Sequence, residues 1–356
     1  MGTHTHWRKC LPLGPDGVTS PPVQPIKKQF LSFINMPARL ALWFALGLVL
    51  AGPDASRAAE KKTYTLGMIA KSQGNQFFEA ARAGANAAAR ELGAKHGLTI
   101  KIDWRTPNEE DAQKQAEFVE QLVLGGVDGI IISSSDANKL TDAIDRADAR
   151  GIPVITFSGD VPASRRFLAL GVDDFKCGEQ TFLELAKLLK GKGVVAAIDG
   201  NPNAANLQQR AAGFRSAAKQ FPGIKVLDIY YHKETPQDAV AKIEQVMQAH
   251  PEITGWGLLG GWPLFTDKAL NWPPGSIQCV SVDALPPELA YIRSKHVQLL
   301  LSQDVYGYGY NSVARLIEKL HLKKTPPAPI ENSPLTPVTL ANVDAFAKNW
   351  EKWLAK

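Results

Sequence analysis

The chain has 356 residues, of which 45% are hydrophobic and 21% charged, and its formal net charge is +5. This composition is typical of a globular protein with one large or two medium domains. Residues 1–58 carry a net charge of +4, which leaves +1 for the remainder, where no block of basic residues occurs. We therefore expect no nucleic-acid partner.

Residues 1–58 show the pattern of a leader rather than of a folded domain. After Met36 come a basic residue (Arg39), an unbroken apolar run over 40–51 and a small-residue stretch that ends at Ala59. This order is typical of a secretory signal peptide (36–58), which predicts export to the periplasm or cell envelope. The run of 12 residues is shorter than the about 20 that a membrane span needs. An uncleaved amphipathic anchor or a buried helix is the alternative, and the start codon is either Met1 or Met36.

The three cysteines predict no disulfide framework. Cys10 lies in the leader, and Cys177 and Cys279 follow it. An exported protein could pair Cys177 with Cys279, but two cysteines about 100 residues apart in a chain of this size are more often unpaired. Cys279 lies in an apolar run and is interpreted as a small core residue.

The stretch Tyr64–Leu92 reads as a strand, a polar turn and an alanine-rich helix. In an open parallel sheet, ligands bind beyond the carboxyl ends of the strands, where this turn would lie. The turn carries the amide of Asn75, and the helix begins with the rings of Phe77 and Phe78. Amides pair with hydroxyls and rings cover C–H faces, so these residues suit a small polyhydroxy ligand. The alternative is that both phenylalanines anchor the helix in the core.

From residue 62 onward, apolar β-branched runs alternate with helical segments. The expected strands are 98–104, 127–132, 153–157, 167–170, 194–198, 224–231, 253–259, 277–282 and 297–301. The expected helices are 109–124, 137–150, 175–190, 204–221, 236–249, 264–270, 286–295 and 309–320. This alternation predicts an α/β fold with doubly wound parallel sheets, and the number of strands favours two domains. A closed eight-stranded barrel is the competing architecture.

The order of several motifs resembles one known family. These motifs are Tyr64–Leu92, GGVDGIIISSSDANKL (125–140), GIPVITFSGD (151–160), LGVDDFKCGEQ (170–180), RAAGFRSA (210–217) and CVSVDAL (279–285). Together they resemble the periplasmic sugar-binding proteins of the ribose-binding type, over residues 62–322. The resemblance implies two similar lobes joined by three hinge crossings, with the ligand between them. It places 62–171 plus 304–332 in the first lobe, and 172–303 plus 333–356 in the second.

The resemblance also implies ligand contacts at matching residues. These contacts come from the amide of Asn75 in the first turn and from the rings of Phe77 and Phe78 that follow it. Asp174 at the first hinge, Asp283 after a strand and Gln303 at the last hinge complete the set. A carboxylate suits this role because it accepts strong hydrogen bonds from vicinal hydroxyls. The alternative for Asp283 is a cap of the helix expected at 286–295.

Three departures from the family pattern indicate a ligand other than ribose. Where the family has an Asp-Arg pair, this chain has only Asp160, in a shifted position. The family's next arginine corresponds most nearly to Gln208, with Arg210 two residues beyond. Residues 260–263 replace a loop that carries an asparagine in the family. Trp262 in this stretch is either a stacking platform for the ligand or a residue packed between the loop and the following helix. These changes favour another pentose, a hexose or a sugar alcohol.

No catalytic or metal-binding spacing is found in the sequence, so we expect neither an enzyme nor a cofactor. The resemblance implies closure of the lobes on the ligand and delivery to the membrane permease of an ABC transporter, by a protein that we expect to be a monomer. The expected hinges are 171–174, 281–285 and 303–306. A sensor that signals to a membrane kinase and a repressor-like regulator are the alternatives.

The composition changes beyond residue 321. Residues 323–337 hold five prolines and predict an extended arm. A short amphipathic helix follows and carries Trp350 and Trp353. We expect the arm to return across the second lobe and to dock both tryptophans there.

Overall fold

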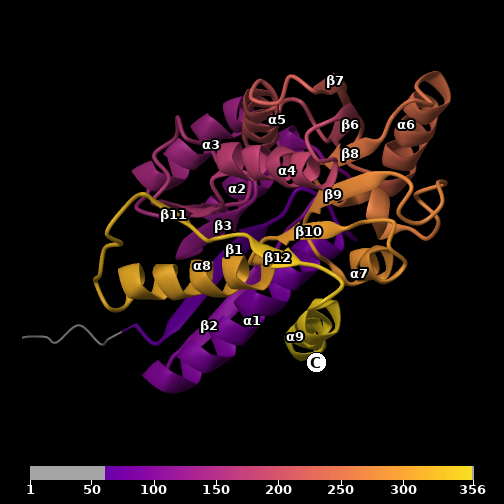
Figure 1. The fold of residues 1–356 in the computed structure, drawn as a ribbon. Coiled ribbons are helices and arrows are strands. Elements are labelled where there is room, and N and C mark those ends of the chain that lie inside the picture. Colours follow the sequence, from indigo (N-terminus) through magenta and orange to yellow (C-terminus); the bar gives the residue numbers. More distant parts are fainter. Residues whose placement is uncertain (1–60, 355–356) are drawn as a thin grey trace, which may run out of the picture. The chain divides into compact units, whose positions relative to one another are not determined.

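The computed structural model describes residues 61–354, which form two six-stranded sheets flanked by helices (Figure 1). The predicted signal peptide, residues 36–58, lies outside the described residues. The expected α/β fold with two doubly wound lobes is confirmed, and most of the expected helices and strands are present within a few residues of their predicted ends.

The first sheet is parallel throughout and has the strand order β11-β5-β4-β3-β1-β2. Its strands are β1 (Thr63–Ile69), β2 (Thr99–Trp104), β3 (Gly129–Ile132), β4 (Val154–Phe157), β5 (Leu168–Gly171) and β11 (Ile330–Asn332).

The second sheet repeats this order as β12-β10-β9-β8-β6-β7, and only its edge strand β12 is antiparallel. Its strands are β6 (Gly193–Asp199), β7 (Ile224–Tyr231), β8 (Gly255–Leu258), β9 (Gln278–Val282), β10 (Leu299–Ser302) and β12 (Thr336–Val338). In both sheets the first strand lies between the second and the third. Ligands of open α/β sheets bind beyond the carboxyl ends of the strands at this point.

Helices cover both faces of each sheet, which explains the continuous apolar runs of the central strands. In β3, Ile130 and Ile132 pack toward α2 and α3, whereas Ile131 packs toward α1 and α8. The helices are α1 (Gln76–His96), α2 (Ala112–Leu124), α3 (Ala137–Ala149), α4 (Asp174–Leu188), α5 (Ala205–Ala218), α6 (Pro236–Ala249), α7 (Pro286–Arg293), α8 (Val305–Leu320) and α9 (Val343–Leu354).

Within the described residues, the chain passes between the two sheets after β5, after β10 and between β11 and β12. The passages fall at 172–173, 303–304 and 333–335. The hinge expected at 281–285 is therefore wrong. Strand β9 ends at residue 282, and α7 connects it to β10 of the same sheet.

Two expected helices differ from the prediction. The helix expected over 264–270 is a short 3-10 helix, Trp262–Phe265. The Tyr291 hydroxyl donates to the carbonyl of Thr266 and accepts from the N–H of Ala269 at 2.9 Å, so these backbone groups are satisfied without a helix. Helix α8 begins at Val305 rather than at residue 309 because Asp304 caps it.

Gly309 lets α8 lie directly against α1, as Figure 1 shows. A Cβ atom at Gly309 would lie 1.7 Å from the carbonyl oxygen of Ala81. The glycine therefore serves the packing of the two helices, because any side chain here would force them apart.

The C-terminal helix α9 lies beside α1 and α7 (Figure 1). The indole N–H of Trp350 donates to the carbonyl of Ala284 at 2.8 Å, which confirms docking on the second lobe for this residue. The Trp353 ring instead stacks on Tyr306 of α8, with centroids 5.5 Å apart, so its expected docking there is wrong. Cys177 and Cys279 are free and buried, as expected.

Candidate functional site

A small space of about 30 Å³ lies between the carboxyl ends of the two sheets, and we call it the inner cavity. Its volume is about the share of one water molecule in the liquid. The cavity is lined by Lys71, Asn75, Phe77, Phe78, Ser158, Asn206, Leu207, Arg210, Glu234, Trp262, Phe265, Asp283 and Gln303.

Rings form one side of the inner cavity. Phe77 and Phe78 are both buried, and their ring centroids lie 5.2 Å apart in an edge-to-face arrangement. Phe78 also packs edge-on against Phe157 of β4. The two alternatives for these phenylalanines are therefore compatible, because each ring is part of the core and also lines the cavity.

Asn75 fixes the start of α1 beside these rings. It is the N-cap residue of α1, and its side-chain oxygen Oδ1 accepts from the N–H of Phe77 at 3.0 Å. The oxygen is thus engaged in the cap, and the amide nitrogen remains the group that can donate to a ligand.

Asp283 and Gln303 form another part of the lining, and Tyr308 supports Gln303. Gln303 donates from Nε2 to Asp283 Oδ1 at 2.7 Å, and the Tyr308 hydroxyl donates to Gln303 Oε1 at 3.1 Å. Burial raises the pKa of Asp283, while Arg210 and the Gln303 hydrogen bond oppose this shift. Asp283 does not cap α7, whose N-cap is Leu285, so that alternative is wrong.

Asp283 has a left-handed backbone conformation with a φ of 77°, and Ser158 on the first sheet has a φ of 58°. Non-glycine residues rarely adopt this conformation, and such residues often occur at functional sites. Both of these residues line the inner cavity.

Arg210 is held against the cavity by Asp174. Its Nε donates to Asp174 Oδ1 at 2.8 Å, and its Nη1 donates to the carbonyl of Leu259 at 2.9 Å. Burial raises the pKa of Asp174 to about 6, although the arginine opposes the shift. Asp174 does not line the cavity, and its contact orients the arginine that does.

A second acid, Asp199, lies buried at the end of β6. Its Oδ1 accepts from the N–H of Gly200 at 2.9 Å, whereas its Oδ2 has no hydrogen-bond partner among the described residues. Burial raises its pKa to about 7, with Arg210 opposing the shift. Asp199, like Asp174, does not line the inner cavity.

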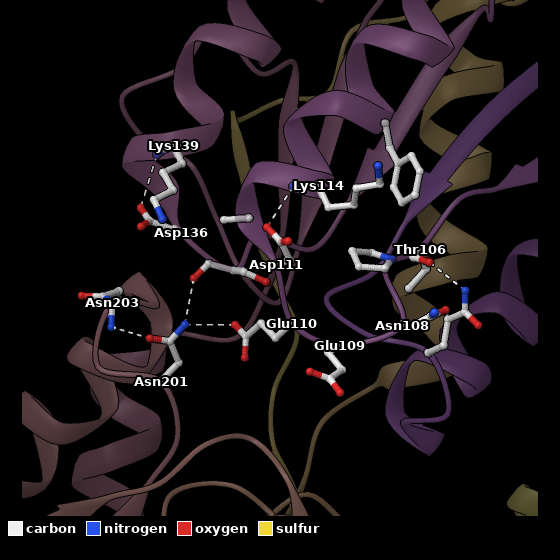
Figure 2. Close-up of a pocket in the computed structure, with 15 residues that line it drawn as sticks. Thr106, Asn108, Glu109, Glu110, Asp111, Lys114, Asp136, Lys139, Asn201 and Asn203 are labelled. Carbon is white, nitrogen blue, oxygen red and sulfur yellow. Dashed lines mark hydrogen bonds between the residues drawn. The ribbon is translucent and has the colours of Figure 1, made fainter.

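Two wider pockets, of about 1030 and 760 Å³, lie outside the inner cavity. Figure 2 shows the smaller of them, with Asn201 of the second lobe reaching to Glu110 of the first. The distance from Asn201 Nδ2 to Glu110 Oε1 is 3.0 Å. This hydrogen bond joins the lobes at the rim of both pockets.

Trp262 lines both the inner cavity and the larger pocket. Its ring packs over Gly260, where a Cβ atom would lie 2.0 Å from a ring carbon, and it contacts the ring of His232 edge-on at 5.3 Å. The packing on Gly260 agrees with the alternative of a ring packed on its own loop, and the role of stacking platform stays a prediction.

The structure does not bring Asp160 and Gln208 to the inner cavity. Asp160 pairs with Arg166 and also accepts from the Thr156 hydroxyl at 2.6 Å. Gln208 donates to the carbonyl of Pro202 at 2.8 Å and is exposed. Arg210, two residues later, lies where Gln208 was expected, because it is on the buried face of α5.

Seven lining residues are not among the ligand contacts expected from the sequence: Lys71, Ser158, Asn206, Leu207, Arg210, Glu234 and Phe265. Lys71 follows β1 and Glu234 follows β7. Their positions just after strand ends were a usable signal, since ligands collect at that edge of the sheet. Only the fold shows that the two strand ends face each other.

The described residues contain no group of three or more His, Cys, Asp or Glu side chains that could hold a metal ion. In the same part of the chain, no helix is long and apolar enough to cross a membrane.

Comparison with known proteins gives consistent matches. The family described as "Periplasmic binding protein domain" matches residues 66–324. The ribose import binding protein of Bacillus subtilis is 26% identical over 271 residues, which cover 76% of this chain and 86% of the relative. The D-apiose import binding protein of Paraburkholderia graminis is 23% identical over 217 residues, with shares of 60% and 66%.

A solved structure agrees with these matches. An ABC transporter solute binding protein from Burkholderia graminis, in complex with D-arabinose, is 26% identical to this chain. Its TM-score is 0.72, and the alignment covers 78% of this chain and 96% of the other.

Proposed function

Because this chain belongs to the family of periplasmic binding protein domains, we propose that it captures a small carbohydrate between its two lobes and delivers it to an ABC transporter. The ligand is a pentose, a hexose or a sugar alcohol. The relatives support this class, since they are named for ribose and D-apiose import, and the similar solved structure holds D-arabinose.

One observation carries the proposal: the inner cavity is lined by aromatic rings together with charged and amide groups that form hydrogen bonds. Phe77 and Phe78 offer their faces to the C–H groups of a sugar. Asp283 and Arg210 offer charge-assisted hydrogen bonds to its hydroxyls, which are about twice as strong as neutral ones. A site of this kind binds a polyhydroxy molecule without transforming it.

The protein captures its ligand by closing the two lobes around it. We assign residues 62–171 plus 304–332 to one lobe, and 172–303 plus 333–356 to the other. The inner cavity is too small for a monosaccharide, so a sugar must enter with the lobes parted. A ligand that touches both lobes stabilises the closed arrangement by its differential affinity for it. The closed form, a monomer in the periplasm, then docks on the membrane permease.

The test is a thermal-shift screen of the purified protein against D-ribose, D-apiose, D-arabinose, D-allose and xylitol, with amino acids as controls. A ligand present at 100 times its Kd adds about 2.7 kcal/mol of stability. We expect at least one carbohydrate to raise the melting temperature. If only an amino acid raises it, the carbohydrate assignment is wrong.

A further inference from the structure

A buried ion pair crosses from one lobe to the other at the wall of the inner cavity. Lys71 Nζ lies 3.1 Å from Glu234 Oε1 and 3.4 Å from Glu234 Oε2. The two side chains are 6% and 7% exposed, and both residues line the cavity. They are 163 residues apart in sequence, so only the facing of the two strand ends brings them together.

Neighbouring groups support this pair. Glu110 Oε1 lies 3.7 Å from Lys71 Nζ, and the backbone N–H of Asn201 donates to Glu234 Oε1 at 3.3 Å. Burial alone would lower the pKa of Lys71, but Glu234 and Glu110 raise it above its ordinary value. Lys71 therefore keeps its positive charge at neutral pH.

The other charged groups that line the cavity also have partners. Arg210 is paired with Asp174, and Asp283 accepts hydrogen bonds from the neutral groups Gln303 and the N–H of Gly261. A buried charge without a partner is strongly unfavourable. A ligand carboxylate would add a further acid to this group, and a ligand ammonium would compete with Lys71 and Arg210 for their carboxylates.

A nearby polar atom indicates the chemistry of the ligand. The side-chain oxygen Oδ1 of Asn206 is buried without a hydrogen-bond partner among the described residues, and Asn206, 7% exposed, lines the cavity. A buried acceptor of this kind requires a donor. A hydroxyl group supplies one without adding charge.

We propose that Lys71 and Glu234 determine specificity: the pair closes over a neutral polyhydroxy ligand and excludes ligands that carry a carboxylate or an ammonium group. Each member gives a charge-assisted hydrogen bond to the ligand only while the other balances its charge. This inference rests on the proposed capture of a carbohydrate and adds the charge class of the ligand.

The experiment measures binding by titration calorimetry for the wild type, Lys71→Met, Glu234→Gln and the double variant. The neutral probes are D-ribose, D-arabinose, D-allose and xylitol, and the charged probes are D-glucuronate and D-glucosamine. We expect the wild type to prefer a neutral probe. Each single variant should bind that probe at least about 100-fold more weakly, because one charge is left unmatched.

The two single variants should also change in opposite directions. Glu234→Gln leaves Lys71 with Glu110, at 3.7 Å, in place of the closer Glu234, and should improve binding of D-glucuronate relative to the neutral probe. Lys71→Met leaves the Glu234 carboxylate without its lysine and should improve binding of D-glucosamine. The double variant should recover the neutral preference and at least about 10-fold of the lost affinity, since neither member of the pair is then left without the other.

Lys187→Met is the matched control, because Lys187 forms a pair with Glu184 on the surface of α4, with the lysine side chain 69% exposed. Melting without ligand checks the fold of each variant. The inference is overturned if the single variants keep the wild-type selectivity, or if the double variant binds no better than the single ones. If no carbohydrate binds the wild type, the proposed function falls and this inference falls with it.

Discussion

Two groups of residues that line the inner cavity are held in place by different interactions. The side with Phe77 and Phe78 is an extension of the core, and its rings are fixed by packing. The side with Asp283 and Gln303 is a hydrogen-bonded network, in which each group is fixed by its polar partners. Changes on the ring side should therefore alter folding and binding together, whereas changes on the network side should separate them.

The largest effect is expected from Phe78→Ala on the ring side. Truncating a buried phenylalanine costs about 3–5 kcal/mol of folding free energy, because it leaves a cavity in the core. Phe78 is buried and packs on Phe77 and Phe157, so urea unfolding should show a loss in this range. Leu124→Ala, at a side chain that is 75% exposed, is the control and should change stability by less than about 0.5 kcal/mol. A small loss for Phe78→Ala would show that packing does not fix this side.

Asp283→Asn should reduce binding with little effect on the fold. Asparagine tolerates the left-handed backbone of this position, so the substitution mainly removes the charge. Hydrogen bonds to a charged group contribute about 1.5–3 kcal/mol, so the affinity for the carbohydrate should fall by roughly 10- to 100-fold in calorimetry. Asp228→Asn on the surface is the control. If Asp283→Asn leaves the affinity unchanged, the carboxylate of Asp283 does not contribute to ligand binding.

Asp199→Asn should change the pH dependence of stability. The pKa of Asp199 is raised to about 7 in the folded protein, above its ordinary value of 3.8. The stability that this group contributes is therefore fully present below pH 4 and is lost as the pH rises through 7. The amide variant imitates the protonated acid. Its melting temperature should be close to that of the wild type at pH 4, exceed it progressively as the pH rises to 7, and remain a few degrees higher at pH 8. A difference in melting temperature between the two proteins that stays constant from pH 5 to pH 8 would contradict the raised pKa of Asp199.

The smallest effect on binding is expected from Asp160→Asn. The carboxylate of Asp160 is engaged by Arg166 and Thr156 and lies outside the cavity lining. Carbohydrate affinity should stay within about threefold of the wild type, and any loss should appear in thermal melting instead. A loss of affinity as large as that of Asp283→Asn would show that Asp160 takes part in ligand binding.

Positions fixed by interactions between neighbouring residues could be predicted from the sequence, whereas positions fixed by packing between distant segments could not. Asn75, Phe77 and Phe78 were predictable because a strand, a turn and a capped helix are adjacent in sequence. Asp160 was also expected at the ligand, but Arg166 and Thr156 engage its carboxylate away from the cavity lining, and this contact depends on the folded turn. Gln208 was preferred over Arg210 because only packing shows which face of α5 is buried.

Local periodicity and turn residues encode the alternation of strands and helices, the two doubly wound sheets and the position of the rings at the cavity, so these features could be predicted from the sequence. The pairing of Lys71 with Glu234 and of Arg210 with Asp174 could not, because it appears only in the folded chain. Such pairs depend on which strand ends face each other, and strand order is set by packing over the whole chain. The charge balance of the cavity is therefore a property of the fold.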